Sequence, residues 1–184
     1  MDASAIDLTG QVALVTGGGG IGRAIALCMA DMGADVAIID NIPERCEETA
    51  ARIRERGRKA LTFEYNVMET DKVAEAVAAT GERFGRLDIL VNNAGGVGRR
   101  HFKDLREKNW RRHIDLNLVS NLAATSAAIP IMIACGIGRL DRSSRIGFKS
   151  PRMLVGKGGM RPSGGLSGVT GGIGIGNEMP VSWL

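Results

Sequence analysis

Cysteine, histidine and aromatic residues are scarce in this chain of 184 residues. The three cysteines, Cys28, Cys46 and Cys135, are an odd number and include no C-x-x-C pair, which argues against a disulfide framework and a zinc site. His101 and His113 have no acidic or cysteine partner at the spacing of metal ligands. We therefore expect no metal centre, and this use of cysteine fits the reducing cytoplasm.

Long hydrophobic runs are also missing. The N-terminal stretch MDASAIDLTGQ is polar, unlike a secretory signal. The most apolar run, 122–137, contains Pro130 and is shorter than the roughly 20 residues of a bilayer span. This run predicts a buried helix, and we expect no membrane segment.

Positive charge is concentrated at one end of the chain. The net charge of +4 arises in residues 139–184, which carry seven basic and two acidic residues. A basic tail can attract nucleic acid, but the aromatic content of 4% leaves little to stack against bases. We therefore expect no nucleic-acid partner.

Strand-like and helix-like segments alternate up to residue 138. Short apolar runs predict strands over 11–16, 35–40, 59–67 and 87–95. Helical spacing and end signals predict helices from the first glycines to Gly33, from Pro43 to Gly57, from Thr70 or Asp71 to Gly85, and from Asp104 to Ile133. Apolar strands between helices are typical of a parallel sheet covered on both faces. The predicted fold class is α/β, with a doubly wound parallel sheet.

The pattern fails after residue 138, where a fifth buried strand is due. The stretch GRLDRSSRIGF would bury Asp141, Arg142 and Arg145 without partners. Further on, 156–176 contain ten glycines in 21 positions, so this segment has little to bury and much entropy to lose. We expect a folded core at 1–138 and a poorly ordered or partly held remainder at 139–184. The sheet would then be incomplete on its C-terminal side.

The stretch VTGGGGIGRA (15–24) gives the first indication of a ligand. Gly17, Gly19 and Gly22 fit G-x-G-x-x-G between a predicted strand and a predicted helix. Such glycines let backbone N–H groups approach a pyrophosphate at the helix N-terminus. Asp40 ends the next predicted strand, where a carboxylate accepts hydrogen bonds from a ribose and repels a 2′-phosphate. A glycine-rich turn without a ligand is the alternative, but the combination predicts a Rossmann-type site for NAD, with NADP disfavoured.

Five segments together resemble the short-chain dehydrogenase/reductase family. They are VALVTGGGGIGRA (12–24), VAIID (36–40), Asn66–Val67, LVNNAG (90–95) and HIDLNL (113–118). The resemblance covers roughly 10–138. It implies an NAD(P)-dependent oxidoreductase that moves a hydride between nicotinamide and a carbonyl or secondary alcohol, of the 3-oxoacyl reductase or hydroxyacyl or ring-alcohol dehydrogenase kind. It also implies a small-molecule substrate and a homo-oligomer formed through the 105–133 helices.

The resemblance also implies roles for particular residues. The pyrophosphate loop would consist of Thr16, Gly17, Gly19, Gly20, Ile21 and Gly22, and Asp40 would bind the adenosine ribose. Asn66 and Val67 would flank adenine, at a place where the family usually has Asp before the apolar residue. Asn93, Ala94 and Gly95 would lie along the cofactor, and Asn117 would support the catalytic lysine through water.

The proton donor of the family is missing from this chain. Its members use a Ser together with a Tyr and a Lys in Tyr-x-x-x-Lys, which places both side chains on one face of a helix. Ser144 and Lys157 match the Ser and the Lys, but Met153 stands in the place of the Tyr. The glycine loop is also one residue shorter than the T-G-x-x-x-G-x-G of the family.

One hypothesis explains these departures together with the early end of the pattern. A shifted reading frame or a deleted gene segment after residue 138 would produce them, and sequencing codons 135–184 of the source gene tests it. Two alternatives to an active dehydrogenase stay open. One is a catalytically dead dinucleotide-binding module, and the other is a non-functional truncated product.

Overall fold

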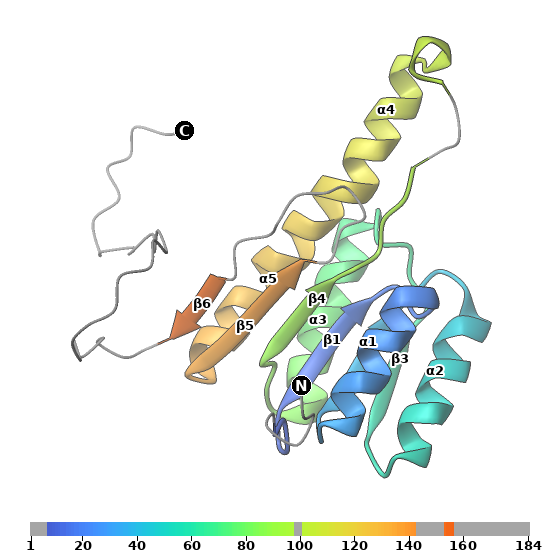
Figure 1. Cartoon of the computed structure of the whole chain (residues 1–184). Helices are drawn as coiled ribbons and strands as arrows, with labels where there is room; N and C mark the ends of the chain where they lie inside the picture. Colours follow the sequence, from blue (N-terminus) through green and yellow to red (C-terminus); the bar gives the residue numbers. More distant parts are fainter. Residues whose placement is uncertain (1–6, 98–100, 143–152, 157–184) are drawn as a thin grey trace, which may run out of the picture.

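A single sheet with helices on both faces forms the described part of the chain (Figure 1). The computed structural model describes residues 7–97, 101–142 and 153–156. The strand order is β3-β2-β1-β4-β5-β6, and only β6 runs antiparallel to its neighbour. The strands are β1 (Val12–Thr16), β2 (Asp35–Ile39), β3 (Ala60–Phe63), β4 (Ile89–Asn92), β5 (Ile137–Arg142) and β6 (Met153–Gly156). The predicted α/β class and doubly wound sheet are confirmed.

The two faces of the sheet carry separate apolar cores. The helices α1 (Gly20–Asp31) and α2 (Pro43–Glu55) cover one face, and α3 (Thr70–Phe84) and α5 (Ser120–Ala134) cover the other (Figure 1). Every residue of β1 is buried, with Val15 facing the first core and Leu14 the second. Burial on both faces explains why the central strands are continuous apolar runs. It also fixes the register that brings the carboxyl ends of β1, β2 and β4 to one edge.

Glycines end the helices where the sequence predicts. Gly33 follows α1 with φ +99°, and Gly85 ends α3 with φ +76°, a backbone conformation that favours glycine. The helix α3 begins at Thr70, one of the two predicted first residues, and its N-cap is Glu69. The strand β3 is also shorter than the predicted 59–67.

The sheet continues past residue 138, which corrects the expectation that the pattern fails there. β5 pairs in parallel with β4, with Arg139 beside Ile89 and Asp141 beside Val91 in the register. Strand pairing is made by backbone groups, so charged residues do not prevent it. The boundary at 138 therefore does not end the sheet. The segments 143–152 and 157–184 lie outside the described residues, and for them the proposed division stays a prediction.

One long helical stretch covers most of the predicted helix from Asp104 to Ile133. After the short η2 (Phe102–Asp104) come α4 (Glu107–Ile114), a π-helical turn η3 (Asp115–Val119) and α5. In α5, Ala124, Ala128 and Met132 are buried in the core that contains α3.

The opposite side of this stretch is exposed, which corrects the prediction of a simply buried helix. Trp110, Ile114, Leu118 and Leu122 recur every four residues and are 45–59% exposed. By length and composition alone, the helical stretch Glu107–Ala134 could cross a membrane, and 28% of its most apolar 18-residue segment is buried. One such helix is weak evidence, because a core helix of a globular protein can have the same length and composition.

Candidate functional site

The loop between β1 and α1 is built on very close backbone approach. Gly17 has φ +90° and donates its N–H to the carbonyl oxygen of Ile39 (2.6 Å), which ties the loop to the end of β2. A Cβ atom at Gly22 would overlap the carbonyl oxygen of Gly17. Only glycine at position 22 lets the first turn of α1 lie against the end of β1. The N-terminus of α1, whose first N–H groups have no acceptor within the helix, is thereby aimed at the carboxyl edge of the sheet.

A threonine clamp joins this loop to the end of β4. The Thr16 hydroxyl accepts hydrogen bonds from the backbone N–H groups of Asn93 and Ala94, each at 3.0 Å. The Asn93 side-chain amide donates in return to the carbonyl oxygen of Thr16 (2.9 Å). Thr16 is 3% exposed, so these bonds are sheltered from water. They hold the glycine loop and the NNAG turn as one rigid edge.

Asp40 lies at the end of β2 with both carboxylate oxygens held by the backbone. One oxygen accepts the N–H of Gly18 (2.7 Å) and the other accepts the N–H of Ile42 (2.9 Å). Each oxygen keeps a second lone pair for a ligand hydroxyl. Because Gly18 donates to Asp40, its N–H is not available to a phosphate. The amides of Gly19, Gly20 and Ile21, which line the cavity, can face an anion.

The carbonyl group of Gly18 is hydrogen-bonded to α2. The Thr49 hydroxyl, which is fully buried, donates to the carbonyl oxygen of Gly18 (2.7 Å) and accepts from Nε of Arg23 (3.0 Å). Arg23 also makes a bidentate ion pair with Glu48 at 2.8 and 2.6 Å. The glycine loop, which is one residue shorter than the family pattern, is therefore held at both the N–H and the C=O group of Gly18.

Cys46 lies beneath this end of the site. Its thiol is close to the carbonyl oxygens of Asp40 and Phe63, at 3.9 and 3.8 Å. Burial raises the pKa of the Cys46 thiol to about 11, and the Asp40 carboxylate raises this pKa as well. The thiol is therefore protonated near neutral pH and acts as a packing group and not as a nucleophile.

Asn117 comes from the π-helical turn. Its amide oxygen accepts the N–H of Gly96 (3.0 Å), and its amide nitrogen donates to the carbonyl oxygens of Gly96 (2.9 Å) and His113 (2.8 Å). π-Helical turns are frequent at functional sites because they re-aim side chains. Here the turn brings Asn117 onto the backbone that follows NNAG.

The glycine loop, Asp40, the NNAG turn and Asn117 line one cavity of about 760 Å³, within the usual range of ligand pockets. Most of the predicted cofactor residues line it, namely Gly17, Gly19, Gly20, Ile21, Asp40, Asn66, Val67, Asn93, Ala94 and Gly95, and so does Asn117. Thr16 and Gly22 lie behind this surface and shape it. The cavity follows the carboxyl ends of β3, β2, β1 and β4, which is where open α/β sheets bind ligands.

The sequence reasoning missed several lining residues. Arg23, Arg45, Tyr65 and Met68 line the same cavity, and so do Arg112 and Leu116. Arg45 lies across the glycine loop, since a Cβ atom at Gly19 would be 2.9 Å from its Cδ. The position of Arg45 in the first turn of α2, five residues after Asp40, was the available signal.

The predicted catalytic residues are not all brought together. Ser144 and Lys157 lie outside the described residues. Met153 begins β6, paired with Leu140 of β5, whereas the matching position in the family pattern belongs to a helix. The assignment of Ser144 and Lys157 as catalytic residues, with Met153 in the place of the Tyr, stays a prediction.

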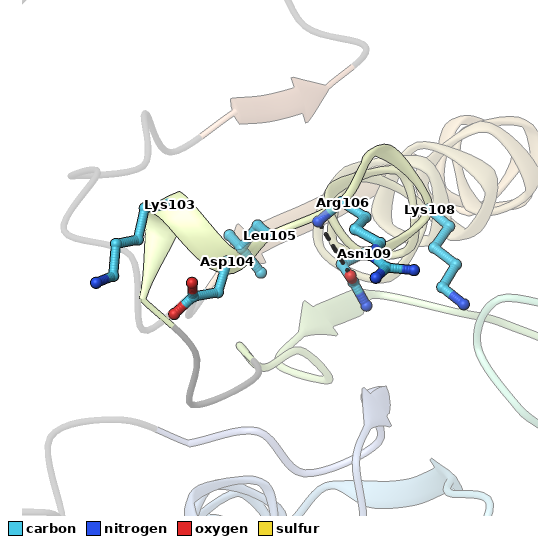
Figure 2. Close-up of a pocket in the computed structure, with 6 residues that line it drawn as sticks. All are labelled: Lys103, Asp104, Leu105, Arg106, Lys108 and Asn109. Atoms are coloured by element: carbon cyan, nitrogen blue, oxygen red, sulfur yellow. Dashed lines mark hydrogen bonds between the residues drawn. The ribbon is translucent and has the colours of Figure 1, made fainter.

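A second cavity, of about 670 Å³, lies at the start of α4. Its lining is mostly charged, and Lys103 and Lys108 point away from each other in Figure 2. No predicted site residue lines it, and its side chains do not converge on a point. Within the described ranges, no group of three or more His, Cys, Asp or Glu residues could hold a metal ion.

Comparison with known proteins identifies the family. The family model described as "short chain dehydrogenase" matches residues 11–152. This chain belongs to the short-chain dehydrogenase/reductase family. Among its curated relatives, oxidoreductase UcpA of Salmonella typhimurium is 37% identical over 140 residues, which are 76% of this chain and 53% of that protein. The chain thus spans about half the length of such relatives.

Solved structures of the family show the same fold and both nicotinamide cofactors. Carveol dehydrogenase of Mycobacterium avium in complex with NAD is 31% identical, with a TM-score of 0.72 over 76% of this chain and 56% of that one. A short chain dehydrogenase of Burkholderia cenocepacia in complex with NADP is 38% identical, with a TM-score of 0.65 over 67% of this chain and 51% of that one. Family members therefore bind NAD or NADP.

The close approach at Gly22 predicts a large cost for a single methyl group. Gly22→Ala should lower the free energy of unfolding by about 1–3 kcal/mol, because the new Cβ overlaps backbone that cannot yield without breaking the Thr16 clamp. Urea denaturation measures this. Gly96→Ala is the control, since a Cβ there meets nothing within 4 Å, and it should change stability by at most about 0.5 kcal/mol. Equal effects of the two substitutions would contradict the packing described here.

Proposed function

We propose that this chain binds NAD along the carboxyl edge of its sheet, as the cofactor half of an oxidoreductase. The observation that carries the proposal is the continuous cavity that joins the glycine loop, Asp40, Asn66 and the NNAG turn. The nicotinamide would supply the hydride for reduction of a carbonyl, or accept it from a secondary alcohol. The residues present fit such a group, because they offer helix-terminal N–H groups for a pyrophosphate and a fixed carboxylate for a ribose.

The preference for NAD over NADP rests on Asp40. Asp40 is 6% exposed, and its carboxylate is held in place by two backbone N–H groups. A 2′-phosphate would bring a second negative charge beside it in a sheltered site. Arg23 cannot easily compensate, because it is committed to Glu48 and Thr49. Arg45 is the cation that remains at this end of the cavity.

Calorimetric titration of the whole chain with NAD and NADP tests this assignment. We expect NAD to bind at least about tenfold more tightly, which corresponds to about 1.4 kcal/mol. Asp40→Asn removes the charge and keeps one of the two acceptors for the backbone N–H groups, so it should weaken NAD binding, strengthen NADP binding and thereby reduce the difference between the two affinities. Arg45→Ala is the control for attraction of the 2′-phosphate by Arg45, because this variant removes the cation that could strengthen NADP binding. Equal binding of the two cofactors by the unaltered chain would contradict the preference, and no binding of either would contradict the function.

A second candidate function is cofactor binding without normal turnover. Its support is Met153, which lies in β6 where the family pattern has the proton-donating tyrosine on a helix. Loss of general acid–base catalysis lowers a rate by about 10²–10⁴-fold. The substrate of an active relative would be a 3-oxoacyl, hydroxyacyl or ring-alcohol compound.

Restoring only the missing side chain should not restore the reaction. Met153→Tyr places a phenol on the strand β6 and not on a helix, where Tyr-x-x-x-Lys brings both side chains to one face. We expect no NADH formation by this variant from a panel of secondary alcohols, measured by absorbance at saturating NAD. Substantial NADH formation by Met153→Tyr, and none by a Met153→Phe control, would contradict the candidate.

We further propose that the partner of this chain is a second copy, docked through the exposed stripe Trp110, Ile114, Leu118 and Leu122. The support is the apolar character of these exposed side chains, the first two of which lie among the charged residues of α4, together with the family resemblance of the 105–133 helices. Apolar patches of this kind mark interaction sites.

The oligomeric state of stripe variants tests this partner. Leu118→Asp puts a charge in the middle of the stripe, so light scattering after gel filtration should show a shift from dimer or larger to monomer. Lys108→Asp changes charge on the same helical stretch, away from the stripe, and should leave the mass unchanged. A monomeric unaltered chain, or equal effects of both substitutions, would contradict the proposed interface.

A further inference from the structure

The order of the strands predicts where each part of a bound dinucleotide lies. From β1 outwards, the cavity passes the N-terminus of α1, then Asp40 after β2, then Tyr65–Met68 after β3. A dinucleotide has the same order on its adenosine side, namely pyrophosphate, ribose and base. If the pyrophosphate lies on α1 and the ribose on Asp40, as proposed above, the purine base reaches the residues that follow β3. The inference below rests on that proposed function.

Asn66 is a polar side chain in the segment after β3, and hydrogen bonds of the turn fix its orientation. Its amide oxygen accepts the N–H of Met68 (3.1 Å), and its backbone carbonyl oxygen accepts the N–H of Glu69 (2.8 Å). This turn leads from β3 into α3. Because a donor already faces the oxygen, the orientation of the amide is determined. Its NH₂ group makes no hydrogen bond among the described residues and lies in a side chain that lines the cavity.

The neighbours of Asn66 are apolar or already paired. Val67 is 8% exposed and offers an apolar surface to a flat ring. The Tyr65 hydroxyl donates to Glu75 (3.1 Å), which also pairs with Lys72 (2.7 Å). The Lys72 ammonium lies 5.3 Å from the centre of the Tyr65 ring. These three side chains bind one another, so the Asn66 amide is the hydrogen-bonding side chain left for the base.

We propose that Asn66 makes this site tolerant of a 6-oxopurine in place of adenine. A free NH₂ group is a donor, and it can meet N1 or N7 of adenine or the 6-oxo group of hypoxanthine, all of which are acceptors. A carboxylate at the same place is an acceptor only, so it would bind the 6-amino group of adenine and repel a 6-oxo group, and hypoxanthine would have to turn its neighbouring N1–H toward the carboxylate instead. Position 66 therefore determines base selectivity, and asparagine makes that selectivity weak.

Calorimetric titration with NAD and with nicotinamide hypoxanthine dinucleotide tests this inference. The unaltered chain should bind the two with affinities within about threefold of each other, because each offers an acceptor to the same donor. Asn66→Asp keeps the turn, since aspartate accepts the Met68 N–H equally well. This variant should keep its affinity for NAD, and its affinity for the hypoxanthine dinucleotide should fall by about tenfold or more.

A matched variant separates base recognition from a general effect of charge. Asn41 also lines the cavity, at the ribose end, and Asn41→Asp makes the same chemical change there. Asn41→Asp should lower the affinities for both dinucleotides by the same factor. The inference is overturned if the unaltered chain binds NAD more than tenfold better than the hypoxanthine dinucleotide, or if Asn66→Asp and Asn41→Asp act alike. In both results NAD still binds, so the proposed function survives. If neither dinucleotide binds, the proposed function fails and the inference is overturned with it.

Discussion

The close contact between the end of β1 and the first turn of α1 is the constraint on which the site depends. Glycine at position 22 lets the helix backbone touch the Gly17 carbonyl group, and the Thr16 hydroxyl fixes the same point to the turn after β4. Without this contact, the N-terminus of α1 would not face the edge of the sheet. The positive end of that helix is a ready site for an anion. The chemistry of the edge therefore begins with a packing requirement.

The parallel sheet then distributes the remaining groups in a fixed order. Each strand ends at the same edge, so the groups that follow β2, β3 and β4 lie in a row on either side of the glycine loop. Asp40 and Asn66 follow in turn on one side, and Asn93 lies on the other. Each of these side chains is held by hydrogen bonds to the backbone, so these side chains lose little conformational entropy when a ligand binds. The loop has one residue fewer than the family pattern, and bonds from Asp40 and Thr49 hold it at Gly18.

The sequence predicted those parts of the fold in which burial dictates the pattern. The strands at 11–16 and 35–40 are buried on both faces, so their apolar runs were unambiguous, and the glycine loop between strand and helix marked the edge that binds. Prediction failed where backbone pairing overrides side-chain preference, as in β5 with Arg139 and Asp141. It also failed for the exposed side of the helix at 107–134, because a composition apolar on most sides does not tell which side is covered. The position of Arg45 five residues after Asp40 was a signal in the sequence, but its contact with the glycine loop depends on how α2 packs against that loop.

Hydrogen–deuterium exchange of the whole chain, with and without saturating NAD, tests the central claim most directly. If the cofactor lies along the carboxyl edge, exchange should slow at the amides of Gly19–Ile21 and in the segment 66–68. Exchange in the second half of α3, away from the cavity, should not change. Slower exchange around 103–109 with no change at Gly19–Ile21, or no change anywhere, would contradict the account.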